Sequence, residues 1–302
     1  MIAAAAGIAG IVWSTEMATR RRMVGECVDG PLVSRALALD TMSNSATRLL
    51  GPLVAGSIYQ AYGLAGCFTV SACFYGVAAL LASGLSYRQL TRKLVLSQVP
   101  GDLSEGLRYV RRDVVICGVL AVTFAMNLMG FPYSALVAPV GRQVFGVSAM
   151  LIGILAASEA CGAAIGGAFL TMREPGINGR ALMVGGSLLF LACVIAMPLV
   201  PSFWLACLLL TAGGFGSAAF ANMQTSLIVL HAPGPIRSRL MGLLTVCIGM
   251  GPLGILMIGT IADFTGPLVA IDLIAATGFV TVAAIGVVWR RRERSYGRAS
   301  PF

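Results

Sequence analysis

Nine long apolar segments constrain this chain more than any other feature of its sequence. A helix crosses the hydrocarbon layer of a bilayer with ~20 apolar residues, whereas barrel strands alternate apolar and polar residues, and that alternation is absent here. The sequence therefore predicts an all-α integral membrane protein with nine transmembrane helices. The segments span residues 2–18, 38–62, 64–86, 114–138, 148–171, 181–199, 202–230, 240–262 and 267–289.

The composition excludes a water-soluble protein and several classes of function. Of 302 residues, 58% are hydrophobic and 11% charged, which leaves too few polar residues to cover a globule of this size. The net charge of +9 does not indicate nucleic-acid binding, because the basic residues lie in short bursts without interleaved aromatics. Seven of the eight cysteines lie in apolar segments without metal-ligand spacing. Gly249-x-Gly251-x-x-Gly254 matches a dinucleotide fingerprint, but it lies inside an apolar span with no strand before it. No P-loop, zinc motif or nucleophile elbow occurs, so we expect no enzyme, no metal and no cofactor.

Arginine-rich connections alternate with connections that hold almost no basic residue. By the positive-inside rule the arginine-rich connections face the cytoplasm, which places the C-terminus inside and Met1 outside. The first segment is not a secretory signal, because three arginines follow it and none precedes it. The bursts follow the first, third, fifth, seventh and ninth segments and begin at Arg20, Arg88, Arg173, Arg237 and Arg290.

One pattern occurs twice, about two hundred residues apart, and each copy follows a Ser-Arg pair. Such a repeat is typical of transporters built from duplicated helix bundles. Four segments precede the second copy within its half but only one precedes the first, so equal halves would require three more helices at the front. We expect a partial N-terminal bundle over 1–86, a cytoplasmic linker over 87–113 and a six-helix bundle with a basic tail over 114–302. The matching residues are Gly51, Pro52 and Leu53 with Gly251, Pro252 and Leu253.

The linker contains a predicted short helix. Asp102 and Glu105 have the spacing of a capping box, and Leu103, Leu107 and Val110 form an apolar stripe. Arginines lie beside that stripe, which favours a helix lying on the cytoplasmic membrane face over a disordered linker. These arginines are Arg108, Arg111 and Arg112.

These motifs, in their order, resemble the major facilitator superfamily, and within it the bacterial exporters that include the enterobactin exporter and related multidrug and macrolide efflux proteins. The resemblance covers nearly the whole chain, as family helices four to twelve. Its carriers are Ser34-Arg35 with Arg48-Leu-Leu-Gly-Pro52, Gly106-Leu-Arg-Tyr-Val-Arg-Arg-Asp113, Asn127-Leu-Met-Gly-Phe-Pro-Tyr133, Gln224, Arg237-Ser-Arg239 and Gly251-Pro-Leu-Gly254.

The resemblance implies gating roles for the glycine-proline segments and for one basic loop. Proline bends a helix and glycine lets a neighbouring backbone approach, so such helices could seal a cavity or could serve packing alone. The loop after the fifth segment resembles the family's cytoplasmic loop motif, but Thr171-Met172 replaces the usual acid, which argues against an ion pair there. The gating candidates are Gly51, Pro52, Gly56, Gly251, Pro252, Gly254, Arg173 and Arg180.

Polar residues inside apolar spans are the candidates for a substrate or proton pathway, because an unpaired polar group at bilayer depth is costly. Packing between helices is the alternative for the amides. Glu159 shares its helix face with small residues, among them Gly162 and Gly166, so this face should meet protein or a cavity and not lipid. The candidates are Glu159, Asn127, Gln224, Asn222 and Glu16.

The implied function is that of a proton-coupled exporter of small amphipathic organic compounds, of drug or siderophore type, in the bacterial cytoplasmic membrane. Its partners would be the lipid bilayer, a small-molecule substrate and protons. The alternative is a truncated, non-transporting membrane protein or an accessory subunit, with a partner supplying the missing helices.

Overall fold

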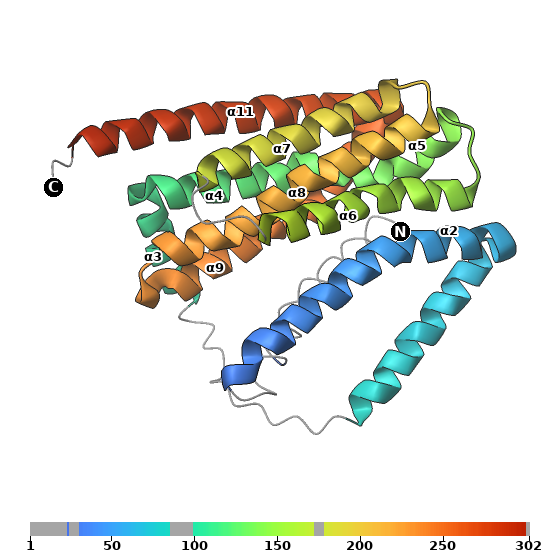
Figure 1. The fold of residues 1–302 in the computed structure, drawn as a ribbon, viewed down its shortest axis with the longest axis horizontal. Helices are drawn as coiled ribbons and strands as arrows, with labels where there is room; N and C mark the ends of the chain where they lie inside the picture. Colours follow the sequence, from blue (N-terminus) through green and yellow to red (C-terminus); the bar gives the residue numbers. More distant parts are fainter. Residues whose placement is uncertain (1–22, 24–29, 85–98, 172–177, 300–302) are drawn as a thin grey trace. The chain divides into compact units, whose positions relative to one another are not determined.

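The computed structural model describes residues 23, 30–84, 99–171 and 178–299, and within these ranges every regular element is a helix. This confirms the predicted all-α class (Figure 1). In chain order the elements are α2 (Gly30–Ser83), α3 (Val99–Arg112), α4 (Val114–Ala125), η2 (Met126–Gly130), η3 (Phe131–Leu136), α5 (Val137–Gln143), α6 (Ala149–Thr171), α7 (Gly179–Ala196), η4 (Met197–Leu199), α8 (Phe203–His231), α9 (Gly234–Ile248), α10 (Gly251–Thr265) and α11 (Pro267–Ala299).

The predicted number of nine membrane helices is not reproduced. Seven helices of the described residues are long and apolar enough to cross a membrane. The predicted segment 2–18 lies outside the described residues. The described parts of segments 38–62 and 64–86 are two helices of α2 that meet at a kink at Gly63, where the backbone leaves the helical region with φ of 65°. A positive φ is inexpensive for glycine, so the chain bends there without a separate loop.

The chain separates into two compact units. The first comprises residues 1–94 and 146–157, and its described parts are α2 and the beginning of α6. The second comprises residues 95–145 and 158–302. The domain boundaries proposed from the sequence stay a prediction, although α3 groups with the second unit.

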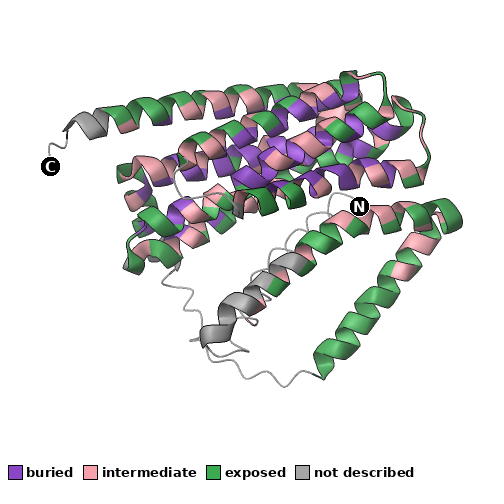
Figure 2. Cartoon of the chain, viewed as in Figure 1, coloured by how far each residue is buried: buried purple, intermediate pink, exposed green. Residues whose placement is uncertain are grey.

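The core of the second unit lies where α4, α7, α8 and α11 pack together. Buried residues concentrate on these helices, as Figure 2 shows. The ring of Phe131 lies 5.2 Å from that of Phe190 and 5.8 Å from that of Phe220. Both partner rings are almost fully buried, so this cluster fixes η3 against α7 and α8.

The first long span of the second unit is interrupted by irregular helix. A π-helical turn, η2, follows α4, and a 3-10 turn, η3, follows in turn. Pro132 lacks an amide hydrogen and its ring would clash with the preceding turn of a regular helix. The wider turn η2 before Pro132 and the tighter turn η3 that contains it accommodate this. Such π-turns often occur at functional sites. Asn127 lies in the π-helical turn.

The two glycine-proline copies adopt different local structures. Pro52 stays inside the part of α2 that precedes Gly63, and the helix continues through it. In the second copy the helix ends at Ile248 and a new one, α10, begins at Gly251, with Pro252 in its first turn. Proline is tolerated there because the first amides of a helix have no intrahelical partner.

The predicted linker helix forms, but it packs on protein. Gly106 and Val110 of α3 are buried, and a Cβ at Gly106 would lie 3.0 Å from Leu243 of α9. Arg239 of α9 forms an ion pair with Glu105 at 2.9 Å. Part of the apolar stripe therefore faces the bundle, while Leu107 remains 46% exposed.

Asp113 joins α3 to α4 at a sharp corner. Its Oδ1 accepts from the backbone N–H groups of Val115 at 2.9 Å and Ile116 at 3.0 Å, which caps α4. The hydroxyl of Tyr109 donates to Oδ2 at 3.4 Å. Burial, followed by the neighbouring Asp113 carboxylate, raises the pKa of Tyr109 above its usual value.

Candidate substrate and proton pathway

Helices α6 and α8 cross at a contact between glycines. A Cβ on Gly162 would lie 2.7 Å from the carbonyl carbon of Thr211, and one on Gly214 would lie 2.6 Å from the amide nitrogen of Ala163. No side chain fits at such distances, so glycine at both positions is required for the backbones to approach this closely. The crossing brings the polar groups of the two helices within reach of each other.

Glu159 lies at this crossing and is buried. Its side chain is 6% exposed, and its Oε1 accepts a hydrogen bond of 2.6 Å from the hydroxyl of Ser217. The same hydroxyl lies 3.0 Å from the carbonyl oxygen of Gly214. The small-residue face therefore meets protein, which is one of the two surroundings that the sequence left open. A carboxyl in this position can keep a hydrogen bond to serine in either protonation state.

A second polar cluster joins α4 to α8. The hydroxyl of Thr123 lies 2.8 Å from the carbonyl oxygen of Val119 and 3.4 Å from Oε1 of Gln224. The side-chain amide of Asn127 donates to the carbonyl oxygen of Thr123 at 2.9 Å. The structure thus brings together two of the predicted residues, Asn127 and Gln224, around Thr123. Sequence reasoning missed Thr123, because a hydroxyl in a membrane helix usually bonds its own backbone and its presence alone indicates no contact with another helix.

Ser217 and Gln224 are seven residues apart on α8 and so lie on one face of it, two turns apart. Asn222 lies on a different face and is exposed. Glu16 and Arg173 lie outside the described residues. In the ranges that the structure describes, no group of three or more histidine, cysteine, aspartate or glutamate side chains could hold a metal ion.

The first glycine-proline copy packs against the start of α6, within the first unit. A Cβ at Gly56 would lie 2.6 Å from the carbonyl oxygen of Ala149, and one at Gly153 would lie 3.1 Å from the carbonyl carbon of Pro52. The amide of Met150 also donates to Oε1 of Gln60 at 3.2 Å. Two glycines, one from each helix, therefore make this contact, whereas Gly51 faces open space.

The second copy makes its close contact within the second unit. A Cβ at Gly254 would lie 2.5 Å from both the carbonyl oxygen of Leu128 and Cγ of Pro132. The motif glycine of α10 is thus seated against the irregular turns that hold Asn127. Gly251 has no heavy atom near its Cβ position, and Pro252 begins α10.

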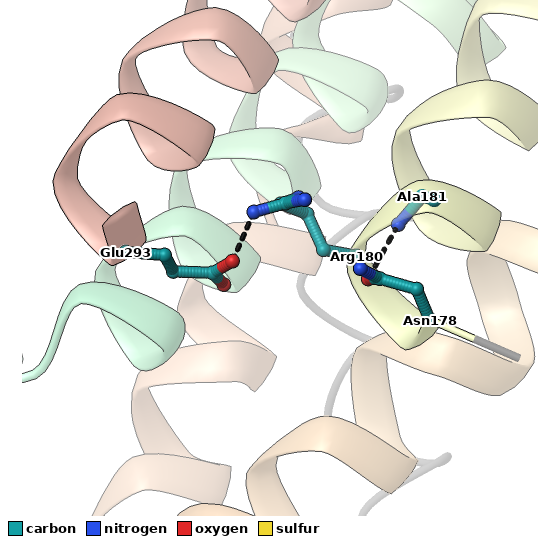
Figure 3. A network of polar contacts seen from close by, with 4 residues as sticks. All are labelled: Asn178, Arg180, Ala181 and Glu293. Atoms are coloured by element: carbon teal, nitrogen blue, oxygen red, sulfur yellow. Dashed lines mark hydrogen bonds and ion pairs between the residues drawn. The ribbon is translucent and has the colours of Figure 1, made fainter. Parts of the chain in front are cut away.

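Arg180 forms an ion pair that the sequence did not predict. Figure 3 shows its side chain reaching from the start of α7 to Glu293 near the end of α11. Asn178 caps α7 by accepting from the amide of Ala181 at 3.2 Å. The expectation that this loop lacks an ion pair is therefore wrong for Arg180, since its acid comes from 113 residues further along the chain. Glu293 lies among Arg290, Arg291, Arg292 and Arg294 in the sequence. This local pattern does not indicate that Glu293 pairs with an arginine of another helix.

A family model described as transmembrane secretion effector matches residues 2–298. No curated protein matches the chain. Among solved structures, the chain is similar to a bacterial homolog of the human lysosomal transporter Spinster. In the inward-facing unoccupied conformation the TM-score is 0.59 at 17% identity, covering 94% of this chain and 76% of that one. In the occupied conformation it is 0.58 at 15% identity, covering 94% and 75%.

Proposed function

Because the chain belongs to the transmembrane secretion effector family of the major facilitator superfamily, we propose that it is a secondary active transporter. We propose further that it exports small amphipathic organic compounds in exchange for protons, with its C-terminus in the cytoplasm of a bacterial cell. The family match over residues 2–298 carries the transport function. The likeness to the Spinster homolog supports the fold alone.

Glu159 is the proposed proton-carrying group. It is a buried acid at the crossing of α6 and α8, where Ser217 donates to it. A carboxyl there binds a proton when the pathway opens to one side and releases it when the pathway opens to the other. The Ser217 hydroxyl can donate to the Glu159 carboxylate. When the carboxyl is protonated, the hydroxyl can accept from it and donate instead to the carbonyl oxygen of Gly214, 3.0 Å away, so the pair persists in both states.

Substrate is proposed to bind near the cluster of Thr123, Asn127 and Gln224. Asn127 and Gln224 are half-buried, so their amides can exchange their present hydrogen bonds for bonds to a polar group of the substrate. The π-helical turn at Asn127 gives this part of the span alternative hydrogen-bonding patterns. Alternating access would then proceed through movement of helices at the close contacts of the two glycine-proline copies, at Gly56 and at Gly254.

The test is gradient-driven efflux by the purified full chain in proteoliposomes loaded with ethidium, an amphipathic aromatic cation. Glu159→Gln keeps a side-chain oxygen that accepts from Ser217 but cannot bind and release a proton. We expect this variant to fold and bind ethidium while its efflux no longer responds to the imposed pH gradient. Asp263→Asn is the matched control, since Asp263 is an exposed acid on α10. Unchanged gradient-driven efflux by Glu159→Gln would leave Glu159 a packing residue.

The alternative is a truncated, non-transporting membrane protein or an accessory subunit that works with a partner. Robust efflux by the reconstituted chain alone would exclude this alternative.

A further inference from the structure

Two runs of arginine emerge at the same end of the second unit. One is Arg108, Arg111 and Arg112 on α3, which leads through Asp113 directly into α4. The other follows Trp289 on α11. A Cβ on Gly118, in the second turn of α4, would lie 2.8 Å from the Trp289 ring, so α11 passes the start of α4 at this point. Figure 1 shows α3, the start of α4 and the end of α11 at one end of this bundle.

The acidic side chains described at this end are already engaged. Glu105 pairs with Arg239, and Asp113 caps α4 and accepts from Tyr109. Glu293 pairs with Arg180. Each of these contacts is made to a residue outside the two arginine runs, and the arginine side chains of the runs are exposed. The exposed arginines are Arg108, Arg111, Arg112, Arg290, Arg291, Arg292 and Arg294.

Helix α3 presents its arginines on a fixed surface. Its buried face, with Gly106 and Val110, packs against the bundle. Arg108, Arg111 and Arg112 then lie on the opposite face by the helical period, and Leu107 lies beside them with 46% of its surface exposed. An exposed leucine next to several arginines suits the boundary between headgroups and acyl chains, where a soluble anion would leave the leucine in water.

We propose that the arginines of α3 and of the end of α11 form a binding surface for anionic phospholipid headgroups. The surface is defined by the seven arginines named above and Leu107. Each arginine near an anionic membrane surface contributes roughly fivefold in apparent affinity. Phosphate accepts well from guanidinium groups in a bidentate manner, which favours arginine over lysine at such sites. Lipid binding at this surface does not depend on the direction or the coupling of transport.

The test is native mass spectrometry of the delipidated full chain in detergent, titrated with phosphatidylglycerol or with phosphatidylcholine of the same acyl chains. We expect phosphatidylglycerol to bind at least about tenfold more tightly, as several arginines at roughly fivefold each would give. The variant R108Q/R111Q/R112Q should lose most of this preference. R108K/R111K/R112K should retain a large part of it, because it keeps the charge.

Arg142→Gln is the matched control, since Arg142 is an exposed arginine on α5 and lies outside this surface. Glycerol phosphate, which has the anionic group without acyl chains, separates a lipid site from a soluble phosphate site. Equal binding of the two lipids would overturn the proposal. It would equally be overturned if glycerol phosphate competed as well as the lipid, or if Arg142→Gln lost the preference as fully as the triple variant. Unaltered thermal unfolding in phosphatidylcholine will show that the triple variant is folded.

Discussion

The crossing of α6 and α8 predicts that two glycines of α6, Gly162 and Gly167, differ in their tolerance of an added methyl group. Gly162 faces the backbone of α8, where a Cβ would lie 2.7 Å from the carbonyl carbon of Thr211 and 2.9 Å from its Cα. Gly167, five residues later, has no heavy atom within 4 Å of its Cβ position. The same change, glycine to alanine, should therefore have opposite effects at the two positions.

The magnitude follows from the geometry. Carbon atoms pack at about 3.5–4.0 Å, so the added methyl group of Gly162→Ala forces α6 and α8 apart by about 0.8 Å or more. Overpacking of this kind costs about 1–3 kcal/mol. Both variants gain about 0.5–1 kcal/mol from the better helix propensity of alanine. That gain cancels in the comparison, so their difference in free energy of unfolding isolates the steric cost.

The measurement is thermal unfolding of the two purified variants and the parent chain in one detergent. At about 2–4 °C per kcal/mol, Gly162→Ala should unfold at a temperature several degrees below Gly167→Ala. Because the shift also moves Glu159 away from Ser217, Gly162→Ala should impair gradient-driven efflux while Gly167→Ala leaves it intact. Equal unfolding temperatures for the two variants would refute the close crossing.

Two further predictions concern polar contacts in the second unit. A double-mutant cycle of Arg180→Gln and Glu293→Gln should give a coupling of up to about 1 kcal/mol, because the side chains are 15% and 32% exposed and solvent screens the pair; zero coupling in unfolding experiments at low salt would contradict the pair. Asp113→Ala should destabilise the chain by about 0.5–2 kcal/mol through loss of the α4 cap. Asp113→Asn, which still accepts from the amides of Val115 and Ile116, should lose much less, and a similar loss in both variants would show that the cap is unimportant.

The sequence predicts the helical class and the approximate spans because bilayer thickness imposes a length and an apolar composition on each helix. It also predicts that the face of Glu159 meets protein or a cavity and not lipid, since small residues at four-residue spacing mark close helix contacts. It does not predict Ser217 as the partner of Glu159. Nothing in the local pattern around Ser217 separates a serine that bonds a distant acid from one that bonds only its own helix.

Long-range partners and irregular turns are the features that sequence reasoning missed. Arg180 and Glu293 are 113 residues apart, and only the packing of α7 on α11 brings them together. The π-helical turn before Pro132 depends on how the freed carbonyl groups are accommodated by α10, which approaches through Gly254. Proline indicates a disturbance in a helix, whereas the form of that disturbance is decided by its neighbours.

The break between α9 and α10 divides one membrane span into two helices with different packing partners. α9 is fastened to α3 through Arg239 and Glu105, whereas α10 is seated on the irregular turns through Gly254. An uninterrupted helix, such as α2 around Pro52, would transmit a change of tilt along its whole length. At Gly249 and Met250 the helix is interrupted. This break lets α9 and the attached α3 change their tilt while α10 keeps its contact with the irregular turns.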